Sequence, residues 1–317
     1  MTDPDQIRAA VEAVAGGRAS VRIEGTRAGI VLDATGLDAA ARDTLEARVR
    51  AAAARPGIEV RVVVTAERVS RTLIAVASGK GGVGKSTVSA NLAIALAALG
   101  RRTGLVDADI YGPSQPRLMG AEGSRPTAHD QQLDPVPTRF GVPMLSMGQL
   151  VEPGRALAWR GPMTAGALGQ LLDADWGATD TLVIDLPPGT GDVQLTMIQK
   201  HRPAGAVIVS TPQDLALIDA ARAIDLFQKA GVPIIGLVEN MAGYACPHCG
   251  EVSDPFGSGG AESAAARLDI PFLGRVPLTI AIREASDAGE PPAAGNGAEG
   301  AAFHQLARAV DGWIKER

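Results

Sequence analysis

The nine residues from Gly79 to Thr87 carry the clearest chemical signal in the chain. They read Gly79-Lys80-Gly81-Gly82-Val83-Gly84-Lys85-Ser86-Thr87, which matches the pattern GxxxxGK[ST]. Glycines let consecutive backbone N–H groups curl around phosphate oxygens, and the start of a following helix adds its positive end. In such a loop Lys85 reaches the β- and γ-phosphates, and the Ser86 hydroxyl ligates Mg²⁺. We therefore predict that this segment binds ATP with Mg²⁺.

Lys80 is a second lysine that an ordinary phosphate loop does not require. Lysine is rare here: of the 30 basic residues, five are lysines, and two of these stand in this loop. Lysine and arginine are not interchangeable around phosphate, so the placement of Lys80 indicates a chemical reason. A solvated surface lysine is the alternative.

Acidic residues follow two apolar runs, as a Mg²⁺-nucleotide site requires. Asp185 ends the run Thr181–Ile184, which is the layout of a carboxylate that holds Mg²⁺ through water. After Leu105-Val106 come Asp107 and Asp109, one of which we expect near Mg²⁺ or the attacking water. Asp109 is the first choice and Asp107 the second. A turn or a helix cap is the alternative for either.

The loop after Asp185 reads Leu186-Pro187-Pro188-Gly189-Thr190-Gly191-Asp192. Its prolines and glycines predict a tight turn beside the γ-phosphate that can sense hydrolysis, with Asp192 and Gln194 as its polar residues. Phosphoryl transfer depends on positioning and charge stabilisation more than on a strong base, so a nearby histidine is not needed.

Cys246 and Cys249 are the only cysteines in the chain. Two cysteines cannot staple a 317-residue fold, so a disulfide scaffold is excluded and the composition fits a reducing cytosol. A CxxC pair can place two thiolates on one metal, but zinc or an iron–sulfur cluster usually needs about four ligands. Two chains related by a two-fold axis would supply four thiolates, which suits a [4Fe–4S] cluster that bridges a homodimer.

Three alternatives for the cysteine pair stay open: zinc that bridges the same dimer, a thioredoxin-like redox pair, and a purely structural pair. A redox pair needs a helix N-terminus that lowers the thiol pKa. Pro247, Gly250 and the lack of a helical pattern argue against that alternative. We expect His248 to be a loop residue rather than a ligand.

Short apolar runs and longer amphipathic segments alternate from Thr72 onward, and these elements must position the residues above. The alternation predicts an α/β fold with a mostly parallel sheet and helices on both faces. Gly112–Thr138 and Ser286–Gly300 are expected to be loops. The expected strands are Leu73–Ala77, Thr103–Val106, Pro143–Ser146, Thr181–Ile184, Ala206–Val209 and Ile234–Val238, and the expected helices include Ser86–Leu99, Ala165–Leu172, Leu215–Ala230 and Ala301–Lys315.

Residues 1–68 are predicted to form a small separate α+β domain, followed by an ATPase domain over 72–317. Residues 1–68 show the patterns of a helix, two strands, a helix and a strand, in that order, with no evident catalytic residue. Ala66–Arg71 is the expected linker.

Composition excludes several other classes of protein. The formal net charge is −5, which gives no support for broad nucleic-acid binding. No 18-residue apolar run is present, so we expect no membrane span. The acidic N-terminus lacks the apolar core of a signal peptide, and a cytoplasmic location is expected.

Together these segments resemble the Mrp/ApbC-type P-loop ATPases, which are iron–sulfur cluster carrier proteins. The loop form is similar to the deviant Walker A motif of the MinD/ParA/nitrogenase-iron-protein class, and the resemblance runs in order from about residue 72 to residue 292. The matching segments are GKGGVGKST, VDADIYGPS, WRGPM (Trp159–Met163), VIDLPPGTGDVQLT (Val183–Thr196), STPQD, VENMAGYACPHCG and the tail PFLGRVPL with IREASDAGEPP.

The resemblance implies a MinD-like homodimer that holds a labile [4Fe–4S] cluster between two CxxC loops. It implies transfer of that cluster to apo-proteins, with ATP coupled to loading or release and with cluster donors as further partners. It also implies that Lys80 reaches the partner's nucleotide and that Asn240 bonds the adenine edge. Residues 1–68 are similar to a small iron–sulfur-assembly domain but have no cysteine and no Asp-Pro-Glu motif, so docking or structural use is expected.

Two other functions remain as alternatives. One is a MinD/ParA-type positioning ATPase, which would use a C-terminal membrane helix or a basic DNA-binding patch. The other is a zinc-bridged dimeric scaffold whose nucleotide site is regulatory.

Overall fold

The computed structural model describes residues 4–37, 39–65, 70–129, 132–150 and 161–317. Contacts divide the chain into two units, residues 1–70 with 175–179 and residues 71–174 with 180–317. Most of the predicted linker Ala66–Arg71 and the first residues of the WRGPM motif lie outside the described residues.

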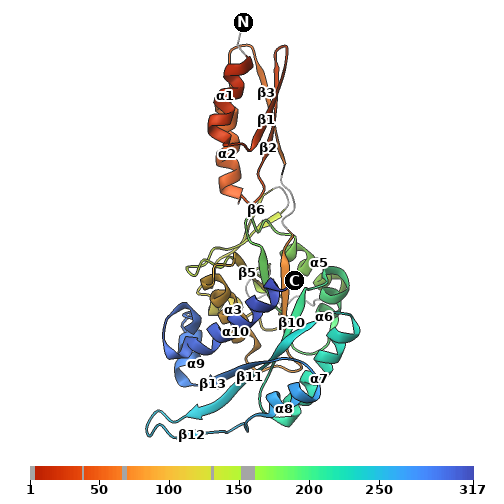
Figure 1. Ribbon diagram of the computed structural model, residues 1–317, viewed down its shortest axis with the longest axis vertical. Coiled ribbons are helices and arrows are strands. Elements are labelled where there is room, and N and C mark those ends of the chain that lie inside the picture. The colour runs from red at the N-terminus through yellow and green to blue at the C-terminus, as the bar shows by residue number, and fades with distance from the viewer. Residues whose placement is uncertain (1–3, 38, 66–69, 130–131, 151–160) are drawn as a thin grey trace. The chain divides into compact units, whose positions relative to one another are not determined.

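The smaller unit is a three-stranded sheet with two helices on one side (Figure 1). Strand β2 pairs antiparallel with β1 and parallel with β3. Its residues alternate between exposed and buried, and Ile30 and Leu32 pack with Ile7, Val11 and Val49 of the helices. The elements are α1 (Pro4–Ala15), β1 (Ala19–Glu24), β2 (Arg27–Asp33), α2 (Ala39–Ala53) and β3 (Glu59–Thr65).

The larger unit is built on a sheet with the order β12-β11-β10-β4-β9-β5-β8, in which β13 also pairs with β11. All of the pairings are parallel except the one between β11 and the short β12. The predicted mostly parallel sheet is therefore confirmed. The strands are β4 (Thr72–Ala77), β5 (Thr103–Asp107), β8 (Met144–Ser146), β9 (Thr181–Asp185), β10 (Gly205–Ser210), β11 (Ile234–Ala245), β12 (Val252–Ser253) and β13 (Phe272–Leu278).

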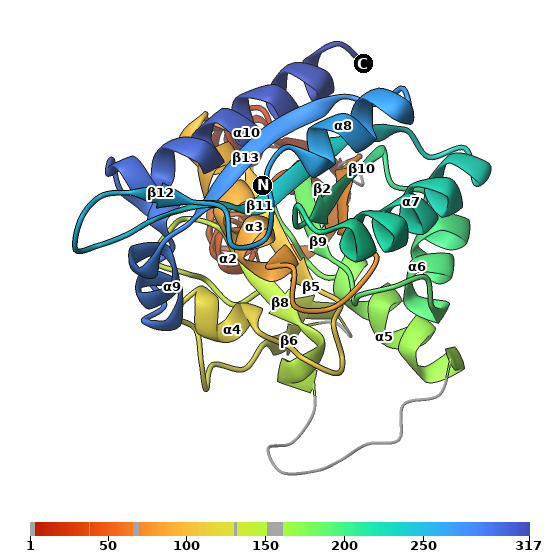
Figure 2. The ribbon, with the colours of Figure 1, turned by 90° about the horizontal axis from the view of Figure 1, so that it is seen from below.

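Helices cover both faces of this sheet (Figure 2). On one face lie α3 (Lys85–Ala98) and α10 (Ala298–Lys315), and on the other lie α5 (Gly161–Leu172), α6 (Asp192–Thr196), α7 (Asp214–Lys229) and α8 (Gly260–Arg267). Every residue of β5, β9 and β10 is buried as a result. Among the described residues, no helix has both the length and the apolar character that a bilayer span requires.

Three segments differ from the sequence-based expectation. Strand β11 does not end at Val238 but continues to Ala245, because its end pairs with β12 in an antiparallel hairpin. The expected loop Gly112–Thr138 contains the short helix α4 (Gln115–Leu118) and the hairpin of β6 (Thr127–His129) with β7 (Gln132–Asp134). The expected loop Ser286–Gly300 includes the end of α9 (Ile280–Asp287) and the turn η3 (Pro292–Ala294).

Candidate nucleotide site and cysteine loop

The predicted site residues meet at the carboxyl edge of the parallel sheet. The glycine loop follows β4, Asp107 ends β5, and Asp185 ends β9. The register pairs Asp107 directly with Asp185, and Val76 of β4 with Asp185. Parallel strands all end at one edge, so this topology gathers residues that are about 100 positions apart in the sequence.

Close packing explains two of the glycines in the loop. Gly84 has φ 79°, and a Cβ there would lie 2.1 Å from the Asn240 side-chain nitrogen. A Cβ on Gly79 would lie 2.0 Å from the Asp219 carbonyl carbon of α7. The Asn240 amide donates a hydrogen bond of 2.8 Å to the Val83 carbonyl, so in this structure Asn240 contacts the main chain of the glycine loop.

Lys85 is held by Asp185 rather than exposed to solvent. Its Nζ lies 2.5 Å from Asp185 Oδ1, and the two side chains are 6% and 0% exposed. The Ser89 hydroxyl donates to the same oxygen at 2.9 Å. Buried opposite charges are favourable only when paired and hydrogen-bonded, as these are. The lysine expected to meet phosphate is thus paired with the carboxylate expected near Mg²⁺.

Asp107 is a fully buried carboxylate beside Asp185. It accepts hydrogen bonds from the backbone nitrogens of Asp109 (3.1 Å) and Gln115 (3.2 Å) and from the Ser146 hydroxyl (2.9 Å). Burial, together with the negative charge of Asp185, raises the pKa of Asp107 to about 8.

This pKa predicts how the stability of the nucleotide-free protein depends on pH. Between its ordinary value of 3.8 and about 8, the folded protein holds a proton on Asp107 that the unfolded chain releases. The free energy of unfolding should therefore fall as pH rises through that window, by at most about 1.4 kcal/mol per pH unit from this group. Denaturant unfolding in EDTA from pH 5 to pH 8.5 measures the slope, which D107N should make less negative. Equal slopes would contradict the assignment.

Asp109 is only 8% exposed but lines a cavity, and Asp107 does not. Its Oδ1 accepts hydrogen bonds from the backbone nitrogens of Tyr111 and Gly112. Asp109 lines a cavity of about 410 Å³ whose other walls include Pro187, Pro188, Thr164 and the segment 191–194. Of the two aspartates predicted near the water, Asp109 is therefore the one that borders this cavity.

The loop after Asp185 forms one wall of the same cavity. Gln194 is buried, and its side-chain nitrogen donates to the Pro187 carbonyl, which closes the turn on itself. Asp192 is the first residue of α6 and also lines the cavity. Both residues predicted for the switch, Asp192 and Gln194, therefore line this cavity.

Lys80 lies apart from the Lys85–Asp185 pair. Its Nζ is 3.4 Å from Gln213 Oε1, just before α7, and the side chain is half-buried. Within the described residues, no recorded hydrogen bond or ion pair joins Lys80 to Asp185. The structure therefore separates the two loop lysines, with Lys85 inside its own site and Lys80 at the side of the loop.

Cys246 and Cys249 lie at the end of the β11–β12 hairpin, which projects beyond the neighbouring helices (Figures 1 and 2). Both thiols are free, with Cys246 half-buried and Cys249 exposed. The Cys246 carbonyl accepts from the Gly250 nitrogen at 2.9 Å, which folds the loop back. The backbone N–H groups of Cys249 and His248, and then the Cys249 thiol, lower the pKa of the Cys246 thiol. Such a loop favours thiolate, the form that binds metal.

The contacts reveal three site residues that sequence reasoning missed: Ser89, Gln115 and Ser146. Ser89 carried a usable signal, because a residue four positions after Lys85 lies on the same helix face. Gln115 and Ser146 reach the aspartates only through tertiary packing. No spacing rule indicates them.

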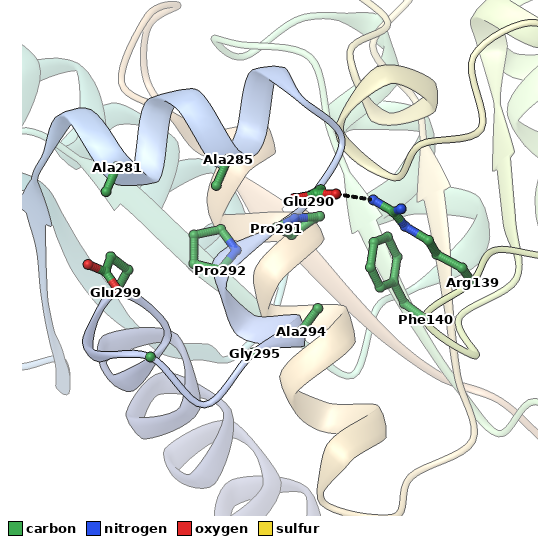
Figure 3. Close-up of a pocket in the computed structure, with 11 residues that line it drawn as sticks. Arg139, Phe140, Ala281, Ala285, Glu290, Pro291, Pro292, Ala294, Gly295 and Glu299 are labelled. Atoms are coloured by element: carbon green, nitrogen blue, oxygen red, sulfur yellow. Dashed lines mark ion pairs between the residues drawn. The ribbon is translucent and has the colours of Figure 1, made fainter.

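A larger cavity of about 590 Å³ lies between α9, η3 and the start of α10 (Figure 3). Arg139 crosses one end, where it pairs with Glu290 at 3.5 Å and donates to the Gly289 carbonyl at 2.7 Å. None of the predicted site residues is among its lining residues. This cavity is therefore separate from the phosphate loop and from the cysteines.

Comparisons with known proteins match this arrangement. The family model of the NUBPL iron-transfer P-loop NTPases matches residues 69–311. An iron–sulfur cluster carrier protein of Pseudomonas fragi is 51% identical over 70% of this chain and 78% of its own length. The iron–sulfur cluster transfer protein NUBPL of Mus musculus is 50% identical over 70% of each chain.

Solved structures show the same fold for the larger unit. A nucleotide-binding protein of Archaeoglobus fulgidus in complex with ADP has a TM-score of 0.63 and 40% identity, covering 72% of this chain and 90% of that one. The cell division ATPase MinD of Pyrococcus furiosus has a TM-score of 0.57 and 26% identity, covering 76% of this chain and 99% of that one. The expected P-loop NTPase fold of the MinD type is confirmed.

Proposed function

The chain belongs to the NUBPL iron-transfer family of P-loop NTPases, and on that premise we propose that it is an ATP-hydrolysing carrier that delivers iron–sulfur clusters to apo-proteins. The observation that carries this proposal is strand β11. Asn240, which contacts the phosphate loop, lies in β11, and Cys246 comes directly after the last residue of this strand, six positions beyond Asn240. A change at the nucleotide can therefore reach the cysteines along one strand.

A backbone feature within β11 supports this coupling. Met241 has φ 59°, a left-handed conformation that a non-glycine residue rarely adopts, and Gly243 follows with φ 70°. These two residues separate the buried part of the strand from the projecting hairpin. Strained positions of this kind cluster at switches and binding sites.

The glycine loop is assigned to ATP and Mg²⁺ on the chemistry of its donors. The backbone of Gly79–Thr87 would cradle the phosphates, Lys85 would bind them, and Asn240 would meet the adenine. The Ser86 hydroxyl and the Asp185 carboxylate are hard oxygen ligands of the kind that Mg²⁺ prefers. When bound, Mg²⁺ neutralises charge that develops on the phosphates. Asp109 would orient the attacking water in the cavity, with Asp107 behind it.

A homodimer is proposed to complete the cluster site. Within the described residues, no group of three or more Cys, His, Asp or Glu side chains could hold a metal ion, so one chain supplies two thiolates. Large apolar side chains lie exposed near the carboxyl edge of the sheet: Tyr111 (86% exposed), Leu215 (73%) and Ile218 (52%). Such exposed apolar groups around a functional edge suit contact with a second copy.

Leu215 provides a test of that contact. L215E places a charge in the proposed interface, and we expect it to raise the dimer dissociation constant in the presence of ATP by about tenfold or more. Light scattering after size-exclusion chromatography measures the dimer. The matched control is L99E, because Leu99 is 42% exposed at the opposite end of α3. Equal effects of the two substitutions would argue against this interface.

The positioning-ATPase alternative fits less well. In α10, which would be the membrane helix, Phe303, Leu306 and Val310 are buried against the core of the unit. The apolar face of α10 therefore packs inside the protein and is not presented to a membrane. The zinc-scaffold alternative uses the same cysteines, and it is separated from the proposal by the metal that the protein holds.

Cluster transfer tests the proposal directly. The anaerobically reconstituted protein is mixed with an apo-ferredoxin, with and without MgATP, and the recovery of ferredoxin absorbance is followed. We expect transfer, with a rate that depends on nucleotide. Protein that binds stoichiometric zinc and donates no cluster would support the scaffold instead.

A further inference from the structure

Gln115 is a fully buried polar side chain for which the proposed function has no role yet. It is the first residue of α4, six positions after Asp109. Its side-chain nitrogen donates to two acceptors, the Ser86 carbonyl at 2.9 Å and Asp185 Oδ2 at 2.9 Å. Its backbone nitrogen donates to Asp107 Oδ2 at 3.2 Å. One residue thus joins the start of α3 to the ends of β9 and β5.

The other end of the same amide is unused. Gln115 Oε1 is buried and has no hydrogen-bond partner among the described residues. Buried carbonyl oxygens without a donor are uncommon in folded proteins and call for a missing partner such as water or an ion's hydration shell. Ser86 and Asp185, to which Gln115 is bonded, are the two residues assigned to Mg²⁺. A hydrated cation would bring O–H donors to this position.

The two oxygens of Asp185 are held from different sides. Oδ1 contacts Lys85 and Ser89, whereas Oδ2 accepts from Gln115. Binding of a nucleotide requires Lys85 to turn toward phosphate. The Lys85 ammonium group then leaves Asp185 Oδ1. The bond from Gln115 does not depend on Lys85, so it can keep the carboxylate oriented after that exchange.

We propose that Gln115 is a positioning residue for Mg²⁺: it fixes the carboxylate of Asp185 against the main chain of Ser86, so that the ion is bound with the nucleotide. The inference rests on the proposed nucleotide function. Groups that orient metal ligands without touching the metal typically account for 10- to 100-fold in metal affinity. Gln115 therefore sets how strongly Mg²⁺ strengthens nucleotide binding, while the phosphates themselves remain bound by the glycine loop.

The test compares nucleotide binding with and without the ion. Isothermal titration of ADP is performed on the full chain in EDTA and over a range of Mg²⁺ concentrations, for the wild type and Q115M. Methionine keeps the length and volume of glutamine but makes neither hydrogen bond. We expect the Mg²⁺ affinity of the ADP complex to fall about 10- to 100-fold, with ADP affinity in EDTA unchanged. The control is Q132M, because Gln132 is exposed and its side chain donates to the Asp173 carbonyl rather than to a residue of the nucleotide site.

Each outcome decides the inference. An unchanged Mg²⁺ affinity in Q115M overturns it, and so does an equal loss of ADP affinity with and without Mg²⁺, which would show a merely structural role. If Q115M does not fold by circular dichroism, Q115N decides by the same criteria, because its amide is one methylene too short to reach both acceptors. A wild-type chain that binds no nucleotide would contradict the proposed function, a result distinct from either failure.

Discussion

Substitution of Cys246 or Cys249 by serine is expected to abolish iron binding. The wild-type dimer should hold about two irons per chain after anaerobic reconstitution, since four thiolates from two loops match one [4Fe–4S] cluster. Each single variant leaves two thiolates per dimer, too few for a cluster. The broad visible absorbance and the iron content measured by a colorimetric assay should both fall to background in C246S and C249S.

The control for this prediction is H248A. His248 lies between the cysteines and is exposed, and its backbone N–H, which lowers the pKa of Cys246, survives the substitution. We expect H248A to keep the wild-type iron content. Mössbauer spectra identify the cluster type in the wild type. Colourless protein with one zinc per dimer, lost in the same cysteine variants, would replace the cluster by zinc and leave the dimer geometry intact.

The elements that flank the glycine loop could be predicted from the sequence because their signals are local. The strand expected over Leu73–Ala77 is observed as Thr72–Ala77, and the helix expected over Ser86–Leu99 is observed as Lys85–Ala98. Asp185 also ends its strand as expected. In each case the pattern and the element that it predicts occupy the same short stretch of chain.

The parts that could not be predicted depend on partners that are distant in sequence or on unusual backbone. Strand β11 continues to Ala245 although Met241 and Gly243 have positive φ, a conformation that is unusual inside a strand. The end of β11 pairs with β12, which lies later in the sequence. Gln115 lies in a Pro- and Gly-rich segment expected to be a loop. Its burial follows from contact with Asp185, 70 residues away. The local sequence pattern around Gln115 does not predict such a contact.

Replacement of the two lysines of the loop is expected to impair different steps, nucleotide binding for Lys85 and hydrolysis for Lys80. Lys85 lies beside Asp185 inside its own site, where it is proposed to bind the phosphates. K85A should therefore lose nucleotide binding. Among the described residues, the Lys80 side chain makes a long hydrogen bond of 3.4 Å to Gln213, and the proposed role of Lys80 is on the nucleotide of a partner chain. K80A should therefore bind ATP with wild-type affinity, measured by titration, and still hydrolyse it slowly.

The expected loss of hydrolysis in K80A is about 10³-fold or more, by analogy with a positively charged residue supplied in trans to a phosphoryl-transfer site. Mixing the two impaired variants tests the trans arrangement. In a mixed dimer, the nucleotide on the K80A chain would receive Lys80 from the K85A chain, so hydrolysis should reappear and rise with the mixed-dimer fraction. Lys80 acting within its own chain predicts no recovery, because neither variant then has a complete site. K200A serves as the control, since Lys200 follows α6 and lines neither cavity.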